Sequence, residues 1–247
     1  MEYSEFFDTR KNTFIKTYEL ILNNIESKKT AMSTTPVMSP DHAETVEPTT
    51  TPVEPTTTPV EPTTTPVEPV EPTKTYNIVE LGTSRSFVSG RIENGVKYWE
   101  PNNPKKWDWG AGCFTKVFAD NLKDYNVNIY SVDPCPRANR VVKTIIRNNK
   151  TVEVIQEYST DFLNKIDFKI DMLYMDHMES SKQACAVHLY DSKLLIEKDL
   201  MSEKALILID DTPADSGIRS KGLMSIPYLL DNGYTTVLHE YQILLSK

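Results

Sequence analysis

The chain has few cysteines, few glycines and no long apolar run. Its three cysteines, Cys113, Cys135 and Cys185, are far apart and show no C-x-x-C spacing. A disulfide framework or a zinc site is therefore not expected, and a reducing compartment fits. No apolar run is long enough to span a bilayer, and the polar, acidic N-terminus is unlike a signal peptide. We expect a cytoplasmic protein with no membrane contact.

The chain also lacks an excess of positive charge. The net charge is -8 at pH 7, and most of it falls in residues 31–74, which leaves the remainder close to neutral. A protein that tracks nucleic-acid phosphates needs a basic surface. Nucleic acid is therefore not the expected partner.

Composition divides the chain into three parts. Residues 1–30 carry apolar side chains at roughly helical spacing, which predicts an amphipathic helix that packs on the rest of the chain or binds a protein partner. Residues 31–74 repeat Glu-Pro-Thr-Thr-Thr-Pro-Val and hold little that can be buried, so we expect a disordered linker with polyproline character. Residues 75–247 form the third part, and any protein partner is expected to bind through residues 1–74.

Residues 75–247 alternate predicted strands and helices. Apolar runs predict strands at about 76–81, 127–132, 152–156, 170–175, 205–210, 234–239 and 241–246, with helices at about 112–123, 136–148, 180–199 and 218–231. This alternation predicts an α/β fold, a doubly wound and mostly parallel seven-stranded sheet with helices on both faces. The last two strands are expected to be a tight antiparallel pair or one bent strand. The long segment 87–110 predicts a lid or a substrate wall.

Several of the predicted strands end in acidic residues. These residues are Glu80, Asp133, Asp176 and the pair Asp210 and Asp211. A single Asp at a strand end is often a helix cap or a turn residue. Parallel strands, however, bring their carboxyl ends to one edge, where ligands bind in open α/β sheets. Like charges gathered there repel one another unless a cation or hydrogen-bond donors compensate.

The order of these motifs resembles that of class I S-adenosylmethionine-dependent methyltransferases. The matching stretches are Glu80-Leu81-Gly82-Thr83-Ser84, Val132-Asp133-Pro134, Met175-Asp176-His177 and Ile209-Asp210-Asp211-Thr212. The resemblance covers residues 76–247 and is strongest to the small-molecule and sugar O-methyltransferase branch. It implies a Rossmann-like methyltransferase fold and transfer of a methyl group from S-adenosylmethionine to a hydroxyl of a small molecule or sugar.

The resemblance also implies a cofactor site. Gly82 would let the backbone approach the cofactor, and the Glu80 carboxylate would order the loop and accept from the cofactor's ammonium group. Asp133 would accept hydrogen bonds from both ribose hydroxyls, as acidic residues do in other nucleotide folds. The adenine amine is expected to meet Asp161 or Ser159.

The first motif departs from the family, which usually continues with further glycines. Ser84 stands in this loop instead, and we count it among the cofactor-binding residues. Either Gly110 and Gly112, at the expected start of the next helix, complete the loop so that their amides meet the cofactor's carboxylate, or the affinity for the cofactor is reduced. Trp107 and Trp109 either form a wall of the cleft or pack the long segment onto the sheet.

The carboxylates after the fourth and fifth strands suggest a metal site by the same resemblance. Asp176, Asp210 and Asp211 would hold one Mg²⁺, which prefers hard oxygen ligands and lowers the pKa of a bound hydroxyl. Asp176 and His177 are the expected catalytic residues, with His177 as general base. The alternative is that the aspartates cap the following segment and His177 only closes a turn.

A nicotinamide-dependent dehydrogenase is disfavoured because no G-x-G-x-x-G follows the first strand. A methyltransferase-like domain that has lost activity and serves as a tethered binding module is the stronger rival, because the first motif lacks its later glycines.

Overall fold

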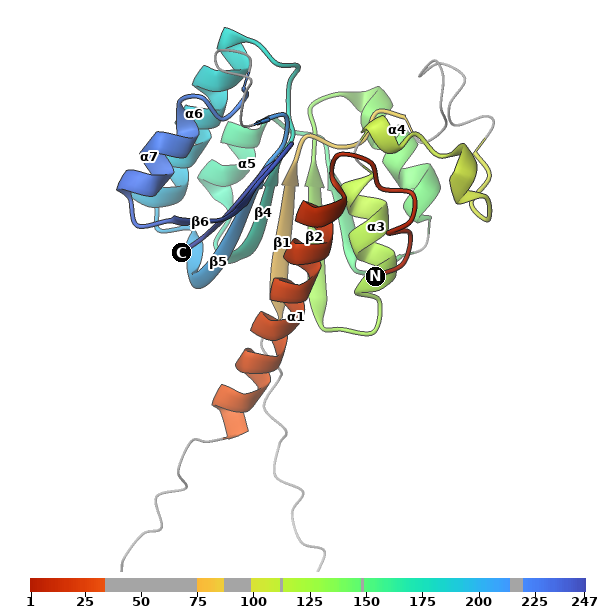
Figure 1. Cartoon of the computed structure of the whole chain (residues 1–247), viewed down its shortest axis with the longest axis horizontal. Helices are drawn as coiled ribbons and strands as arrows, with labels where there is room; N and C mark the ends of the chain where they lie inside the picture. The colour runs from red at the N-terminus through yellow and green to blue at the C-terminus, as the bar shows by residue number, and fades with distance from the viewer. Residues whose placement is uncertain (34–74, 87–98, 112, 148, 214–219) are drawn as a thin grey trace, which may run out of the picture.

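A seven-stranded sheet forms the centre of the protein (Figure 1). The computed structural model describes residues 1–33, 75–86, 99–111, 113–147, 149–213 and 220–247. The strands are β1 (Tyr76–Leu81), β2 (Val127–Val132), β3 (Val152–Ile155), β4 (Ile170–Met175), β5 (Met201–Ile209), β6 (Thr235–His239) and β7 (Ile243–Ser246). Their order across the sheet is β3-β2-β1-β4-β5-β7-β6.

The strand pairing confirms the predicted fold class. β1 pairs in parallel with both β2 and β4, β2 pairs in parallel with β3, and β4 pairs in parallel with β5. β7 runs antiparallel to β5 and to β6, so the last two strands form the expected hairpin at one side of the sheet. All seven predicted strands are present, and only β5 is clearly longer than its apolar run suggested.

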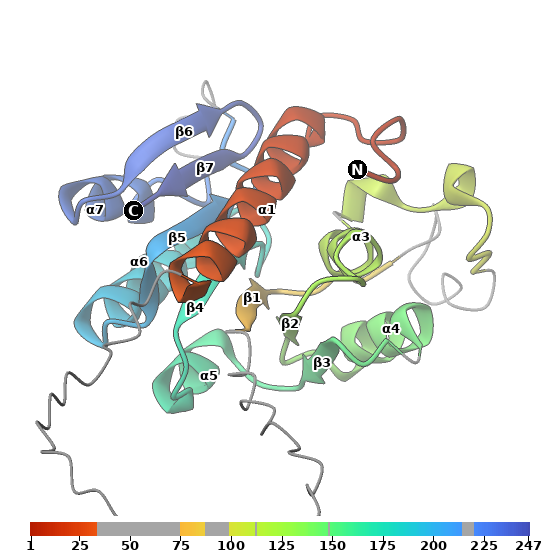
Figure 2. The same ribbon diagram turned by 90° about the horizontal axis from the view of Figure 1, so that it is seen from below.

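Two helical layers cover the sheet (Figure 2). The helices are α1 (Lys11–Ser33), α3 (Phe114–Asn121), α4 (Pro136–Ile146), α5 (Ser159–Lys165), α6 (Lys182–Glu197) and α7 (Ser225–Asp231). Side chains of α1, α3 and α4 form one buried core against the sheet, and those of α5, α6 and α7 form the other. The short helix α5 was not predicted, because its seven residues offer too little periodicity to recognise.

The helix α1 belongs to the core of the protein. It packs on the sheet face between α3 and the β6–β7 hairpin, as both ribbon views show. Its side chains Phe14, Ile21 and Ile25 are at most 5% exposed. Each such burial contributes roughly 1.5–3 kcal/mol before entropy is counted. Of the two roles considered for residues 1–30, packing on the rest of the chain is therefore the one found in the structure.

Some predictions concern residues that the structure does not describe. Most of the predicted linker, residues 34–74, lies outside the described residues, as do residues 87–98 of the long segment and Gly112. The remainder of that segment forms two short 3-10 helices, Pro104–Lys106 and Trp109–Ala111. In the described part of the chain, no helix has the length and apolarity needed to cross a membrane.

Candidate active site

The candidate site lies at the carboxyl ends of β1 and β4. The two strands are neighbours in the sheet, but the helices that follow them cover opposite faces. Such a switch point leaves a crevice in open α/β sheets. A cleft of about 660 Å³ lies here, bordered by Gly82, Asp133, Asp176, Asp210 and Lys221 among others. Its volume is in the range of small-molecule sites.

Gly82 is required by the closeness of the two strand ends. The amide of Asp176 donates to the carbonyl of Leu81 at 2.9 Å, which brings the segment after β4 against the turn after β1. Gly82 has a φ of +86°, and an added Cβ would lie 2.5 Å from the backbone of His177. The glycine borders the cleft, and it permits close contact between two segments of the chain itself.

Glu80 is buried beneath the cleft. It is 1% exposed, and hydroxyls of Thr115 and Ser131 donate to its Oε2 atom. Ser131 also lies 2.7 Å from the Thr83 hydroxyl. Burial raises the pKa of Glu80 to about 7, although these hydroxyls act to lower it. Glu80 thus joins β1 to Ser131 of β2 and Thr115 of α3, and it does not line the cleft from which an ammonium group would be bound.

Asp133 follows β2 and borders the cleft. Its two oxygens accept from the backbone amides of Thr83, at 3.1 Å, and Cys135, at 2.7 Å. These bonds hold the carboxylate beside the β1 loop and leave acceptor capacity on both oxygens. The position suits a carboxylate that accepts from vicinal hydroxyls.

The remaining predicted cofactor residues divide into those at the cleft and those away from it. Gly110 lines the cleft, and so does Ser159, the first residue of α5. Ser84 is buried, with its hydroxyl donating to the carbonyl of Ala111 at 3.2 Å, so it ties the β1 loop to the cleft wall. Asp161 is exposed and does not line the cleft.

The three carboxylates predicted as metal ligands do come together. Suitable oxygens of Asp176, Asp210 and Asp211 lie within 4.8 Å of one another. Two cations of the chain already contact them. Lys221 Nζ lies 2.8 Å from both Asp176 Oδ1 and Asp211 Oδ2, and Arg10 forms a two-point pair with Asp210.

These cations divide the carboxylates into two electrostatic types. Burial opposes ionisation of Asp210, but the Arg10 guanidinium lowers the pKa of Asp210 below its usual value. Burial and the neighbouring Asp210 charge raise the pKa of Asp176 well above its usual value, although Lys221 acts in the opposite direction. The side chain of Asp176 remains 20% exposed, so it is the member of the pair that can exchange a proton with a ligand.

The cluster does not fit a magnesium ion. Mg²⁺ needs octahedral oxygen ligands at close range, and the Lys221 ammonium is within hydrogen-bond distance of two of the three carboxylates that would supply them. The Asp210 oxygens are used by Arg10 and by Gln242, which donates to Oδ1 at 2.8 Å. Cations of the chain itself therefore occupy the place that a metal ion would take.

The ring of His177 points away from the open cleft. Both of its ring nitrogens are buried, with Nε2 3.0 Å from Asp191 Oδ2. The ring stacks on that of His188 with a centroid separation of 4.2 Å. His188 and Asp191 belong to α6 and are fully buried. His177 borders the cleft, but its ring contacts α6 and has no nitrogen exposed to an acceptor.

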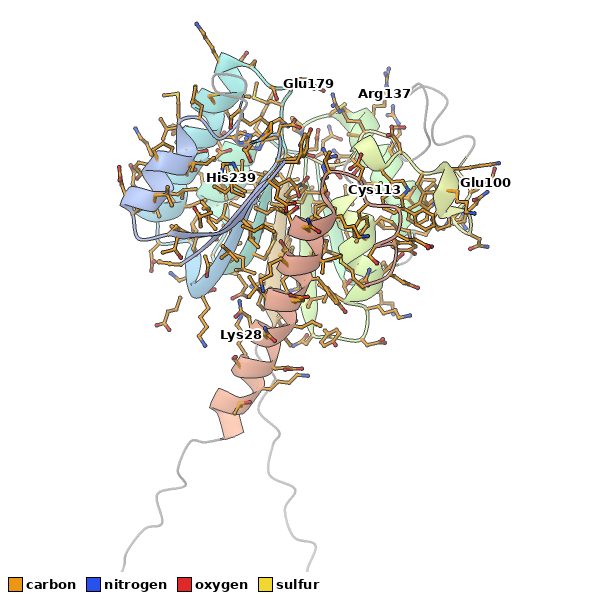
Figure 3. The ribbon with its side chains drawn as sticks, viewed as in Figure 1. Lys28, Glu100, Cys113, Arg137, Glu179 and His239 are labelled. Atoms are coloured by element: carbon orange, nitrogen blue, oxygen red, sulfur yellow. The ribbon has the colours of Figure 1, made fainter. Side chains whose placement is uncertain are left out.

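Arg10, Lys221 and Tyr241 are cleft residues that the motifs did not indicate. The Tyr241 hydroxyl donates to Asp211 Oδ1, and the Arg10 guanidinium lies 5.0 Å from the centre of the Tyr241 ring. Figure 3 shows Glu179, another residue at this cleft, at the end of the molecule toward which the β1 and β2 arrows point. In the sequence, these cations are indicated only by the excess of carboxylates at the strand ends, because like charges gathered there need compensating groups.

Comparison with known proteins gives likeness only at the level of structure. No protein-family model matches the sequence, and no curated protein matches it. The mostly parallel seven-stranded sheet with an antiparallel β7 agrees with the fold that the sequence predicted.

Three solved structures illustrate the likeness. A Streptococcus mutans protein assigned as a methyltransferase, in complex with SAH, is 11% identical over 70% of this chain and 89% of its own, with a TM-score of 0.45. Fibrillarin from Aeropyrum pernix, with natively bound S-adenosyl-L-methionine, is 14% identical over 70% of this chain and 66% of its own, with a TM-score of 0.42. A Nostoc punctiforme protein assigned as an O-methyltransferase is 11% identical over 70% of this chain and 52% of its own, with a TM-score of 0.43. Likeness this remote carries no argument about activity, so the fold assignment rests on the strand order itself.

Proposed function

We propose that the cleft binds S-adenosylmethionine and transfers its methyl group to a hydroxyl of a small molecule or sugar. The observation that carries this proposal is the pair of unlike carboxylates at the two ends of one cleft. Asp133 borders it on the β2 side, and Asp176 borders it on the β4 side. The carboxylate of Asp133 suits ribose hydroxyls, and the carboxylate of Asp176 suits an acceptor hydroxyl that must give up its proton. The cleft therefore has chemistry for a nucleoside cofactor and for a second substrate.

The cofactor end is formed by the loops after β1, β2 and β3. Asp133 accepts from the ribose hydroxyls, and the Gly82 turn leaves the backbone open to the methionine part. Tyr158 and Ser159 border the same end. The role of these residues is to hold the sulfonium so that its methyl group faces the acceptor, since orientation supplies much of the rate in a two-substrate transfer.

The acceptor end is formed by the carboxylate cluster. Bound S-adenosylmethionine would supply the methyl group, and its sulfur would be the leaving group that keeps the electron pair of the broken C–S bond. The hydroxyl proton passes to the ionised carboxylate of Asp176. A raised pKa makes this carboxylate a better proton acceptor than an ordinary aspartate once it is ionised.

Calorimetric titration of SAH into the full chain tests the cofactor end. We expect binding that weakens about tenfold or more in Asp133→Ala, because hydrogen bonds to a carboxylate are lost. Asp161→Ala is the matched control, since Asp161 is exposed and lies outside the cleft lining, and its affinity should equal that of the wild type. An absence of SAH binding in the wild type would favour the inactive binding module.

Transfer of a labelled methyl group tests the acceptor class. We expect incorporation into a panel of sugars or small hydroxyl compounds and not into RNA, since the folded part of the chain has no excess of basic residues. Asp176→Asn should lower the turnover while leaving SAH affinity unchanged. Incorporation into RNA alone would contradict the proposed acceptor.

A further inference from the structure

Arg10 comes from outside the methyltransferase-like part of the chain, yet it forms one wall of the cleft. Its Nε atom lies 3.2 Å from Asp210 Oδ1, and its Nη2 atom lies 2.8 Å from Asp210 Oδ2. The two side chains are 8% and 1% exposed. A buried, bidentate pair of this kind fixes the plane and the position of the carboxylate. Arg10 therefore fixes the carboxylate of Asp210, the residue that directly follows β5.

Further contacts make Arg10 part of a network around the cluster. Gln242 donates to Asp210 at 2.8 Å and to the Tyr174 hydroxyl at 3.2 Å. The Thr13 hydroxyl, one turn after Arg10, donates to the Oε1 atom of the same glutamine. The start of α1 is thus joined to β4, β5 and the β7 end through a single buried set of polar groups.

The segment before Arg10 holds a second cleft wall in place. The ring of Phe6 stacks on Trp109 at 5.8 Å, and that of Phe7 meets the same tryptophan edge-on at 5.5 Å. Tyr3 lies 4.9 Å from the ring of Trp107. Gly110, which immediately follows Trp109, lines the cleft. The tryptophans therefore pack the long segment, and the surface they pack against is the N-terminal segment of the chain.

The helix α1 is also anchored at its far end. Lys28 Nζ lies 2.6 Å from Asp171 Oδ1 at the start of β4, and Asn24 donates to the carbonyl of Lys204 at 3.0 Å. Figure 3 shows Lys28 at the end of the molecule opposite to Glu179. Because α1 spans the height of the sheet and is held at both ends, the position of Arg10 is determined by the whole helix.

We propose that Arg10 is a positioning residue of this site and that residues 1–33 are part of the enzyme, not an appended tether. The inference rests on the proposed function. Arg10 pairs with Asp210 and lies beside the ring of Tyr241, and both of these residues belong to the acceptor end. Its loss should therefore affect transfer to the acceptor and leave the cofactor bound as before.

Arg10→Lys in the full chain is the first variant to measure. Lysine keeps the charge but has one nitrogen in place of the two-point guanidinium contact. We expect SAH affinity within twofold of the wild type and a turnover reduced by roughly tenfold or more, in line with the cost of misplaced reacting groups. Lys11→Gln, at the adjacent exposed position, is the control and should retain full turnover.

The outcomes separate this inference from the proposed function. Wild-type SAH binding together with an Arg10→Lys variant of full turnover would overturn the role of Arg10 and leave the methyltransferase proposal standing. If the wild type binds no SAH, the proposed function fails. Whether residues 1–33 are packed as part of the site is then tested by a measurement that needs no ligand.

Hydrogen exchange of the full chain provides that measurement. Amides of α1 should exchange as slowly as those of the neighbouring helix α3, because both pack into the same core. Arg10→Met should accelerate exchange at the start of α1 and around Asp210, whereas Lys11→Gln should not. Free exchange throughout residues 11–33 in the wild type would overturn the inference that this segment belongs to the site.

Discussion

The Lys221 ammonium lies 2.8 Å from Asp211 Oδ2, and the same nitrogen lies 2.8 Å from Asp176 Oδ1. Its side chain is 3% exposed, so water contributes little to its solvation. The neighbouring carboxylates raise the pKa of Lys221 despite its burial, and the group therefore stays charged. The positive charge at this cluster is supplied by the chain itself.

Metal independence follows from this arrangement. Methyl transfer by the wild type should be unchanged by EDTA or by added Mg²⁺. In Lys221→Met the carboxylates of Asp176 and Asp211 lose the ammonium that they share, and free carboxylate oxygens of this kind favour a divalent ion. We expect Lys221→Met to gain Mn²⁺ binding, measured by the loss of the free Mn²⁺ signal in electron paramagnetic resonance.

The control for this experiment is the double variant Lys221→Met/Asp211→Asn, which removes one of the ligands and should bind Mn²⁺ more weakly. Circular dichroism would confirm that each variant is folded. Tight Mn²⁺ binding by the wild type, lost in Asp176→Asn, would show that the lysine yields its place to a metal and would contradict the prediction.

Glu80 should make stability depend on pH. Its pKa is raised to about 7 in the folded protein, whereas in the unfolded chain it lies near the usual 4.5. Between these two pH values Glu80 is protonated in the folded state and ionised in the unfolded state. The stability that the protonated Glu80 contributes at low pH is therefore lost as the pH rises through 7. The largest effect is on the order of 3 kcal/mol, from about 1.4 kcal/mol for each pKa unit.

Glu80→Gln should remove this dependence, because the amide is neutral at every pH. Urea unfolding should find the variant close to the wild type at pH 4.5 and more stable than the wild type at pH 8. Glu203→Gln, at an exposed position of β5, should follow the wild-type curve. A Glu80→Gln variant that is less stable at pH 8 would mean that the ionised carboxylate is needed in the folded state.

The sheet and the positions of the acidic residues at its carboxyl edge could be predicted from the sequence. Strands such as β1 and β4 are buried on both faces, so each appears as a short apolar run that is easy to recognise. An acidic residue directly after such a run must lie at the carboxyl edge. For this reason the positions of Asp133 and Asp176 follow from strand assignment alone.

The charge balance of the cluster could not be predicted in this way. Arg10 and Asp210 are 200 positions apart, and nothing local to either residue shows that they meet. Lys221 lies within the helix predicted at about 218–231, but α7 begins only at Ser225, so the predicted helix did not indicate the direction of the Lys221 side chain. The orientation of His177 toward Asp191 likewise depends on how α6 packs, which spacing along the sequence does not determine.

Gly82 and Gly233 form a matched pair for testing the close contact between β1 and β4. Both have positive φ, +86° and +89°, so alanine is strained at either position. They differ in their surroundings. A Cβ at Gly82 would lie 2.5 Å from the His177 backbone, whereas a Cβ at Gly233 would meet no atom within 4 Å.

The comparison separates backbone strain from steric conflict. Gly233→Ala should cost about 1 kcal/mol of unfolding free energy, the cost of the left-handed conformation alone. Gly82→Ala should cost roughly 3 kcal/mol more, because a backbone atom cannot move aside as a side chain can. Urea unfolding measures both. Because the displaced segment carries Asp176, Gly82→Ala should also reduce methyl transfer, while Gly233→Ala should not. Equal costs for the two variants would mean that the turn after β1 can move away from β4, and that the cleft is not fixed by this contact.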